Sequence, residues 1–164
     1  SGLGTLPHLT YELFKLETGI SATLVNYKGG GPALIAVVAG EADMMFDIVG
    51  SRIHSGEVRA LAVTGASRHP DIPDVPTMAE VGLPAMTSTS GTELVGPAGT
   101  PRDVVRLLNG MLNELIQIPD VQSKMKALGL TPAGGTPEDF GAWVNEQRQK
   151  WTRVVKQAGA HSSN

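Results

Sequence analysis

The glycine triplet Gly29–Gly31, followed by Pro32, constrains this chain more than any other feature of its sequence. An alternating segment, residues 21–25, precedes the triplet, and a nearly all-apolar segment, residues 33–39, follows it. Glycine allows a turn with positive φ, and proline suits the first helical position, where its missing N–H is not needed. The pattern predicts a strand end, a tight turn and a helix that is buried rather than half exposed.

A second strand is predicted immediately after this helix. Residues 42–46 form a short apolar run that ends at Asp47, as is typical of a strand in a covered parallel sheet. Strand, turn, helix and strand together make a βαβ unit, so the sequence predicts an α/β fold.

Ligands of such sheets bind at the carboxyl ends of the strands, which here carry Tyr27, Lys28, Gly29 and Asp47. The glycine turn could cradle an anion against the positive end of the helix, or it could be only a tight turn. Asp47 could receive an ammonium or hydroxyl group, or it could cap the next turn.

A second loop of small residues, Ser1–Thr5, precedes a helix that Pro7 is predicted to open. Gly2, Leu3 and Gly4 offer backbone N–H groups, and Thr5 is suited to cap the helix. This stretch could equally be a capped helix after a disordered terminus. Two such loops in one domain favour a shared anionic ligand.

The remaining elements are predicted from periodicity and capping signals. The first half contains a helix at 7–17, a short helix or turn at 48–55, a strand at 58–64, a proline-rich crossing at 69–77 and a capping box at 77–80. Residues 84–99 form an extended crossing, after which helices are predicted at 101–118, 119–128 and 137–158, with capping boxes beginning at Thr100 and Thr136.

These last helices carry apolar stripes that need a partner surface. On the first of them the stripe consists of Val104, Leu107, Leu108, Met111, Leu112 and Leu115. The three helices could form a bundle, or they could cover a sheet that this chain lacks.

Composition excludes several classes of function. A net charge of −3 argues against nucleic-acid binding through phosphates, and no apolar run reaches the roughly 18 residues of a membrane span. The chain has no cysteine, and its four histidines show no metal-binding spacing. The Gly-x-Ser-x-Gly signature of a nucleophile elbow is absent. We therefore expect no metal, no cofactor and no catalytic residue.

Taken together, the motifs resemble one family, the substrate-binding receptors of tripartite tricarboxylate transporters, also called the Bug family. The resemblance rests on Ser1-Gly-x-Gly-Thr5-x-x-His8, on Tyr27-Lys28-Gly29 through Asp47, on residues 58–77, and on Pro97-Ala-Gly-Thr-Pro101. The ending Gly134-Gly-Thr-Pro137, with Trp151 and Lys156, also fits.

The resemblance implies a truncated type II periplasmic-binding-protein fold and a periplasmic, non-catalytic receptor for a small carboxylate. It implies a second, ligand-binding domain at residues 1–88, a crossing at 89–99, and helices at 100–164 that return to an incomplete first domain. It also implies that Gly2, Leu3, Gly4, Thr5, His8, Tyr27, Lys28, Gly29 and Asp47 contact the ligand. The implied partners are transporter membrane subunits. From the uncovered apolar stripes we also expect either a homodimer or association with a separate N-terminal fragment.

Two departures touch the wall of the implied binding cleft. Ser88–Gly91 stands where the family usually has an aromatic residue, and the segment between Asp47 and Gly56 looks shorter than usual. Two other functions stay open: a ligand sensor for a membrane kinase, and an enzyme that uses the glycine loops on phosphate or acyl groups. The lack of a base–nucleophile pair counts against the enzyme.

Overall fold

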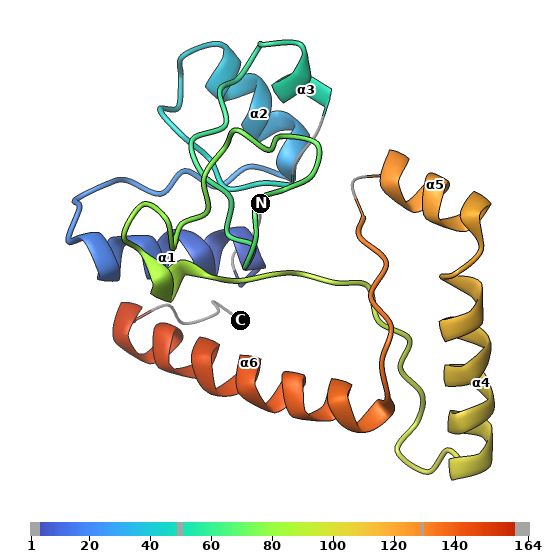
Figure 1. Cartoon of the computed structure of the whole chain (residues 1–164). Coiled ribbons are helices and arrows are strands. Elements are labelled where there is room, and N and C mark those ends of the chain that lie inside the picture. The colour runs from blue at the N-terminus through green and yellow to red at the C-terminus, as the bar shows by residue number, and fades with distance from the viewer. Residues whose placement is uncertain (1–3, 49–50, 129, 160–164) are drawn as a thin grey trace. The chain divides into compact units, whose positions relative to one another are not determined.

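A computed structural model of the chain describes residues 4–48, 51–128 and 130–159 (Figure 1). Its elements in chain order are α1 (Leu6–Thr18), α2 (Gly30–Val38), α3 (Ser51–His54), the 3₁₀ turn η1 (Pro84–Met86), α4 (Arg102–Leu115), α5 (Pro119–Ala127) and α6 (Pro137–Ala158). Two compact units are present: residues 1–91 with 151–164, and residues 92–150. Every helix predicted from periodicity is found within a few residues of its expected bounds.

Glycine and proline mark the ends of the first helix as the sequence predicts. Pro7 lies in the first turn of α1, and Gly19 ends the helix with φ 68°, donating its N–H to Lys15 O at 2.8 Å. The helix α2 begins at Gly30, ahead of Pro32, and Gly40 follows it with φ 75°. Contrary to expectation, α2 is not buried all round: only Ala33 and Ala36 are buried along it. Its larger apolar residues Ile35 and Val38 are exposed.

Two of the three predicted capping boxes form. Thr77 accepts the Glu80 N–H at 3.1 Å, and Glu80 Oε2 accepts the Thr77 N–H at 2.7 Å. At the start of α6, Thr136 and Asp139 make the same reciprocal pair, each at 3.1 Å. The box at Thr100 is wrong, because its hydroxyl donates to Pro97 O at 2.8 Å and α4 begins without a side-chain cap.

The predicted strands are extended in the described residues but do not pair into a sheet. The one bridge there joins Val63 to Thr77 in the parallel sense. The Val63 N–H donates to Pro76 O at 2.9 Å, and the Met78 N–H donates to Val63 O at 2.8 Å. Apolar runs show that a segment tends to be extended and covered, but a ladder also needs a neighbouring strand. Residues 21–25 and 42–46 have no such neighbour within the described ranges.

The first unit is built around three fully buried side chains, those of Leu13, Met86 and Val154. Phe14 and Phe46 meet edge to face at this core, with their ring centroids 5.8 Å apart. The last turns of α6 therefore pack with residues 1–91, whereas the sequence grouped all of 100–164 together. The assignment of residues 1–88, 89–99 and 100–164 to receptor domains stays a prediction.

The second unit contains α4, α5 and the first part of α6. The polar face of α4 holds the loop before α6: Asn109 and Asn113 each donate to Gly135 O at 3.0 Å, and Asn113 Oδ1 accepts the Gly135 N–H at 3.1 Å. The opposite stripe of α4 is exposed throughout, and no residue of this helix is buried.

Candidate functional site

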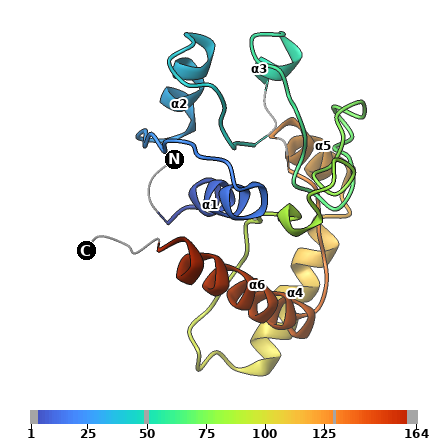
Figure 2. The same ribbon diagram turned by 90° about the vertical axis from the view of Figure 1, so that its left-hand side faces the viewer.

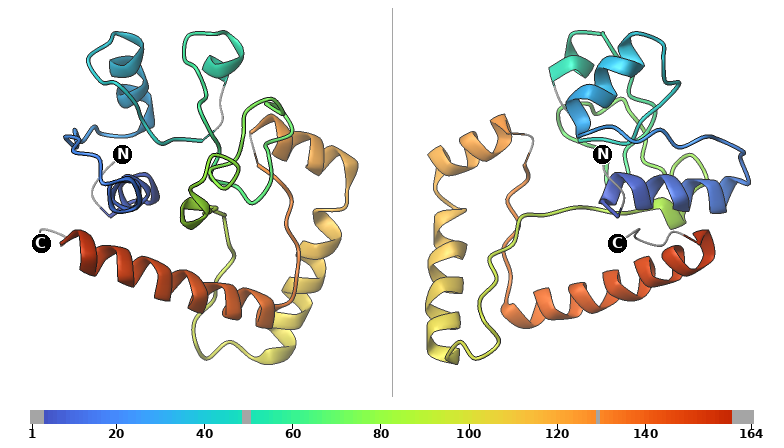
Figure 3. Two further views of the ribbon diagram at one scale, coloured as in Figure 1. Left: turned by 60° about the vertical axis from the view of Figure 1, so that its left-hand side comes forward. Right: turned by 180° about the vertical axis from the view of Figure 1, so that it is seen from behind.

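The predicted site residues lie at the beginnings of two helices of the first unit. Gly4, Thr5 and His8 lie at the beginning of α1, and Tyr27, Lys28 and Gly29 lead into α2. The views of Figures 1, 2 and 3 agree in placing the beginnings of α1 and α2 at the same end of this unit. Gly2 and Leu3, the other predicted members, lie outside the described residues.

The turn into α2 has the backbone form that its glycines predict. Gly29 adopts φ 113°, a left-handed conformation that favours glycine, and its N–H donates to Tyr27 O at 2.9 Å. That donor is therefore occupied within the turn itself. The donors left to an anion are the N–H groups of Gly30 and Gly31, since the first N–H groups of a helix have no intrahelical partner.

Asp47 lies directly against this helix start. A Cβ atom built on Gly30 would lie 2.5 Å from Asp47 Oδ2, so the carboxylate occupies the space that the absent side chain leaves. Asp47 Oδ1 accepts the Ile48 N–H at 2.9 Å, which fixes the carboxylate from the other side. The side chain is exposed, so a ligand can reach it. The structure thus brings together the two strand ends that the sequence singled out.

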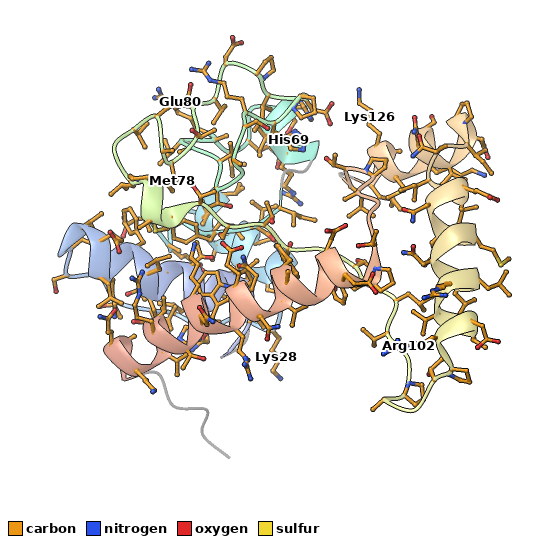
Figure 4. All side chains as sticks on the ribbon, turned by 60° about the horizontal axis from the view of Figure 1, so that its bottom comes forward. Lys28, His69, Met78, Glu80, Arg102 and Lys126 are labelled. Carbon is orange, nitrogen blue, oxygen red and sulfur yellow. The ribbon has the colours of Figure 1, made fainter. Side chains whose placement is uncertain are left out.

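Lys28 lies at the turn that leads into α2. Its side chain is exposed, and Figure 4 shows it on the opposite side of the first unit from Met78 and Glu80. Lys28 therefore extends into solvent from the same turn that Asp47 borders.

The loop before α1 is arranged differently from the prediction. The Gly4 N–H, expected to face a ligand, donates instead to His8 Nδ1 at 2.9 Å. Thr5 holds the N-cap position with extended φ and ψ, but its hydroxyl makes no capping bond. His8 itself is buried, with 7% of its surface exposed, and its ring bonds to the loop of its own chain.

The sequence analysis did not single out Glu12, which lies one turn after His8 on α1. It is buried, with its Oε2 atom 3.1 Å from Lys15 Nζ and its Oε1 atom 3.8 Å from His8 Nε2. The spacing of His8, Glu12 and Lys15 at four and three residues along a helix was the available signal.

Neither a metal site nor a membrane span is visible in the part of the chain that the structure describes. No group of three or more histidine, aspartate or glutamate side chains is placed to hold a metal ion there. Within the same residues, no helix combines the length and the apolar character that crossing a membrane requires.

Comparison with known proteins identifies the family. Residues 1–160 match the model of the tripartite tricarboxylate transporter family receptor. The chain belongs to this receptor family. A curated relative, the UPF0065 protein in the tcbD–tcbE intergenic region of Pseudomonas sp. (strain P51), is 40% identical over 94% of the chain and 47% of its own length.

Solved structures agree with this assignment. "R. palustris Rpa4515 with adipate" is 34% identical with a TM-score of 0.75, over 95% of this chain and 53% of that one. "Structure of periplasmic binding protein BugD" is 31% identical with a TM-score of 0.74, over 98% and 56%. The α/β fold is thus that of about half a periplasmic binding protein, and the chain spans about half the length of these three proteins. The receptors of this family are extracytoplasmic solute-binding proteins, and the predicted family and truncated fold are confirmed.

Proposed function

We propose that this chain forms part of a periplasmic receptor that binds a small carboxylate and delivers it to the membrane subunits of a tripartite tricarboxylate transporter. The observation that supports this most directly is the contact between Asp47 and Gly30 at the beginning of α2. It joins a helix start, which attracts anions, to a side chain that can select among them.

The charge of Asp47 favours particular carboxylates. A ligand carboxylate at the beginning of α2 would lie beside the carboxylate of Asp47, and like charges at close range repel. A ligand that also carries a hydroxyl or ammonium group can donate to Asp47 and turn this repulsion into a charge-assisted hydrogen bond. We therefore expect hydroxy acids or amino acids to bind better than plain dicarboxylates. The related R. palustris protein Rpa4515 is described with adipate, which is a plain dicarboxylate.

The binding site can be tested on the chain itself by NMR. Uniformly ¹⁵N-labelled protein would be titrated with succinate and, as a neutral control of the same carbon length, with 1,4-butanediol. We expect succinate alone to shift the amide signals of Thr5, Gly30, Gly31 and Ile48. Equal shifts with the diol, or shifts confined to residues 92–150, would refute the proposed site.

The role of Asp47 can be tested with malate, which differs from succinate by one hydroxyl group. A hydrogen bond to a charged partner contributes about 1.5–3 kcal/mol. Malate should therefore bind at least roughly tenfold more tightly than succinate. Asp47→Asn should reduce this preference by weakening the acceptor and should improve succinate binding by removing the repulsion. An unchanged ratio of the two affinities would remove Asp47 from the ligand's surroundings.

A further inference from the structure

His8, Glu12 and Lys15 lie at four- and three-residue spacing along α1, and the first two of them are buried. His8 is also in contact with the loop before the helix. His8 Nδ1 accepts the Gly4 N–H at 2.9 Å, so this nitrogen carries a lone pair. The ring proton of the neutral imidazole is then on Nε2, which faces Glu12 Oε1 at 3.8 Å. Only the neutral ring in this one tautomer satisfies Gly4.

We propose that His8 is a positioning residue that fixes the backbone at Gly4 and Thr5 through its neutral imidazole, and that protonation of His8 releases this backbone. The protonated ring carries hydrogen on both nitrogens, so Nδ1 can no longer accept the Gly4 N–H. Gly4 adopts φ 78°, and nothing lies within 4 Å of the position of a Cβ atom there. The His8 bond ties this left-handed residue to α1.

Two charged side chains follow His8 on its own helix. Glu12 and Lys15 lie on the following turns, and their ion pair at 3.1 Å offsets the negative charge that Glu12 presents to the imidazole. The turn η1, which packs against α1, has no titratable side chain. The segment that Phe46 packs against Phe14 ends in the exposed Asp47. In the last turns of α6, Arg153 and Lys156 are exposed.

Direct ligand contact by His8 is the competing role, and the burial of the ring argues against it. His8 is 7% exposed, and its two nitrogens face Gly4 and Glu12. The residue thus acts on a ligand through the loop rather than by touching it. This last step rests on the proposed function, whereas the coupling between His8 and Gly4 does not.

Two matched variants separate the positioning role from a merely structural one. In His8→Asn the acceptor oxygen is the same number of bonds from the backbone as Nδ1, so it can accept the Gly4 N–H but cannot titrate. In His8→Gln the acceptor lies one bond further out, and this variant serves as the control.

The decisive readout is the ¹⁵N NMR signal of the Gly4 amide, followed from about pH 8 to about pH 5, where histidine titrates. In the unmodified chain, without any ligand, we expect the Gly4 signal to move together with the ¹⁵N signals of the His8 ring. In His8→Asn the Gly4 signal should stay near its neutral-pH position throughout, and in His8→Gln it should be displaced at every pH. A Gly4 signal that ignores the His8 titration, or that is the same in both variants, would overturn the proposal.

Succinate binding at neutral pH provides a second arm that depends on the proposed function. His8→Asn should keep the affinity within about twofold, and His8→Gln should lower it several-fold. If the Gly4 signal follows His8 while neither variant changes binding, the positioning role stands and the ligand site lies elsewhere. If the Gly4 signal is independent of His8, the positioning role fails whatever the ligand does.

Discussion

At the scale of single residues, neighbouring glycines in one turn have different reasons to be glycine. Gly29 needs its left-handed φ of 113°, whereas Gly30 needs the absence of a side chain because Asp47 occupies that space. Gly31 has neither constraint, since nothing lies within 4 Å of the position of its Cβ atom. The triplet that looked uniform in the sequence therefore contains one position, Gly30, at which the turn lies against Asp47.

Replacing these glycines in parallel tests this difference. In Gly30→Ala the new Cβ would lie 2.5 Å from Asp47 Oδ2, so the carboxylate must turn away and its bond to the Ile48 N–H should weaken. Gly31→Ala makes no such contact and is the control. We expect the ¹H–¹⁵N signal of Ile48 to move in the first variant and to stay in place in the second. The same signal position in both would show that Asp47 does not depend on Gly30.

Glu80 provides a pH-dependent contribution to stability away from the candidate site. The Arg68 guanidinium, hydrogen-bonded to this carboxylate at 2.9 Å, and the Thr77 N–H lower the pKa of Glu80 to about 2. Because the folded state lowers this pKa, the stabilisation is complete above the ordinary glutamate range near pH 4.5 and is lost as the pH falls towards 2.

Arg68→Gln removes the largest cause of this shift and should raise the pKa of Glu80 towards its ordinary value. The bonds from Thr77 should keep part of the shift. Arg59→Gln removes an equal charge at another exposed position and is the control. The side-chain carboxyl ¹³C signal of Glu80, followed against pH, measures the effect. A Glu80 pKa that responds equally to both replacements would mean that overall charge, rather than the Arg68 contact, sets it.

At the scale of elements, the sequence predicted the helices well because the signals that begin and end them are local. Gly19 and Pro119, for example, act on the turn in which they lie. The capping boxes show where this locality fails. Thr100 and Thr136 have the same sequence signature, yet Thr100 turns to the carbonyl of Pro97. The prediction of strand pairing failed more widely. Pairing depends on which segments meet in space, and a single run of residues does not indicate which segment will lie beside it.

The candidate site was predictable to a similar degree. Asp47 and the glycine turn were singled out because both follow strand-like runs, and the structure places Asp47 against Gly30. Their role as a ligand site stays a prediction. The bond between His8 and Gly4 was not predicted, because a motif names the residue but does not tell whether its ring faces a ligand or its own backbone. Only the geometry around Gly4 decides this.

The apolar stripe of α4 is exposed along its whole length, so we expect another surface to cover it. Leu107 is 63% exposed and Met111 is 57% exposed, and burying each such side chain is worth roughly 1.5–3 kcal/mol. We expect a second copy of the chain, which carries the same stripe, to cover it.

We therefore expect the isolated chain to dimerise at micromolar concentration in sedimentation experiments. Leu107→Glu should shift it towards the monomer, whereas Leu128→Glu, at an equally exposed position outside the stripe, should not. A stable monomer with a cooperative melt would contradict this prediction, as would a stripe that pairs only with an added N-terminal fragment.

At the scale of the whole molecule, α6 belongs to both compact units. Residues 137–150 of this helix group with α4 and α5, while Trp151 and Val154 pack at the core formed by Leu13 and Met86. The sequence showed that these apolar residues share one face of a helix, but periodicity does not say which surface that face meets. This is why the sequence-based grouping of 100–164 separated Val154 from the core that it completes.

The crossing of three chain segments at Val63 and Thr64 has a consequence for how water enters the protein. Besides the two bonds between Val63 and residues 76–78, the Ser88 N–H donates to Thr64 O at 2.7 Å. Thr77 and Ser88 are buried beside these bonds, so none of the three segments can detach without exposing the other two. The amide hydrogens of Val63, Met78 and Ser88 should therefore exchange with deuterium together and slowly, as one cooperative opening unit.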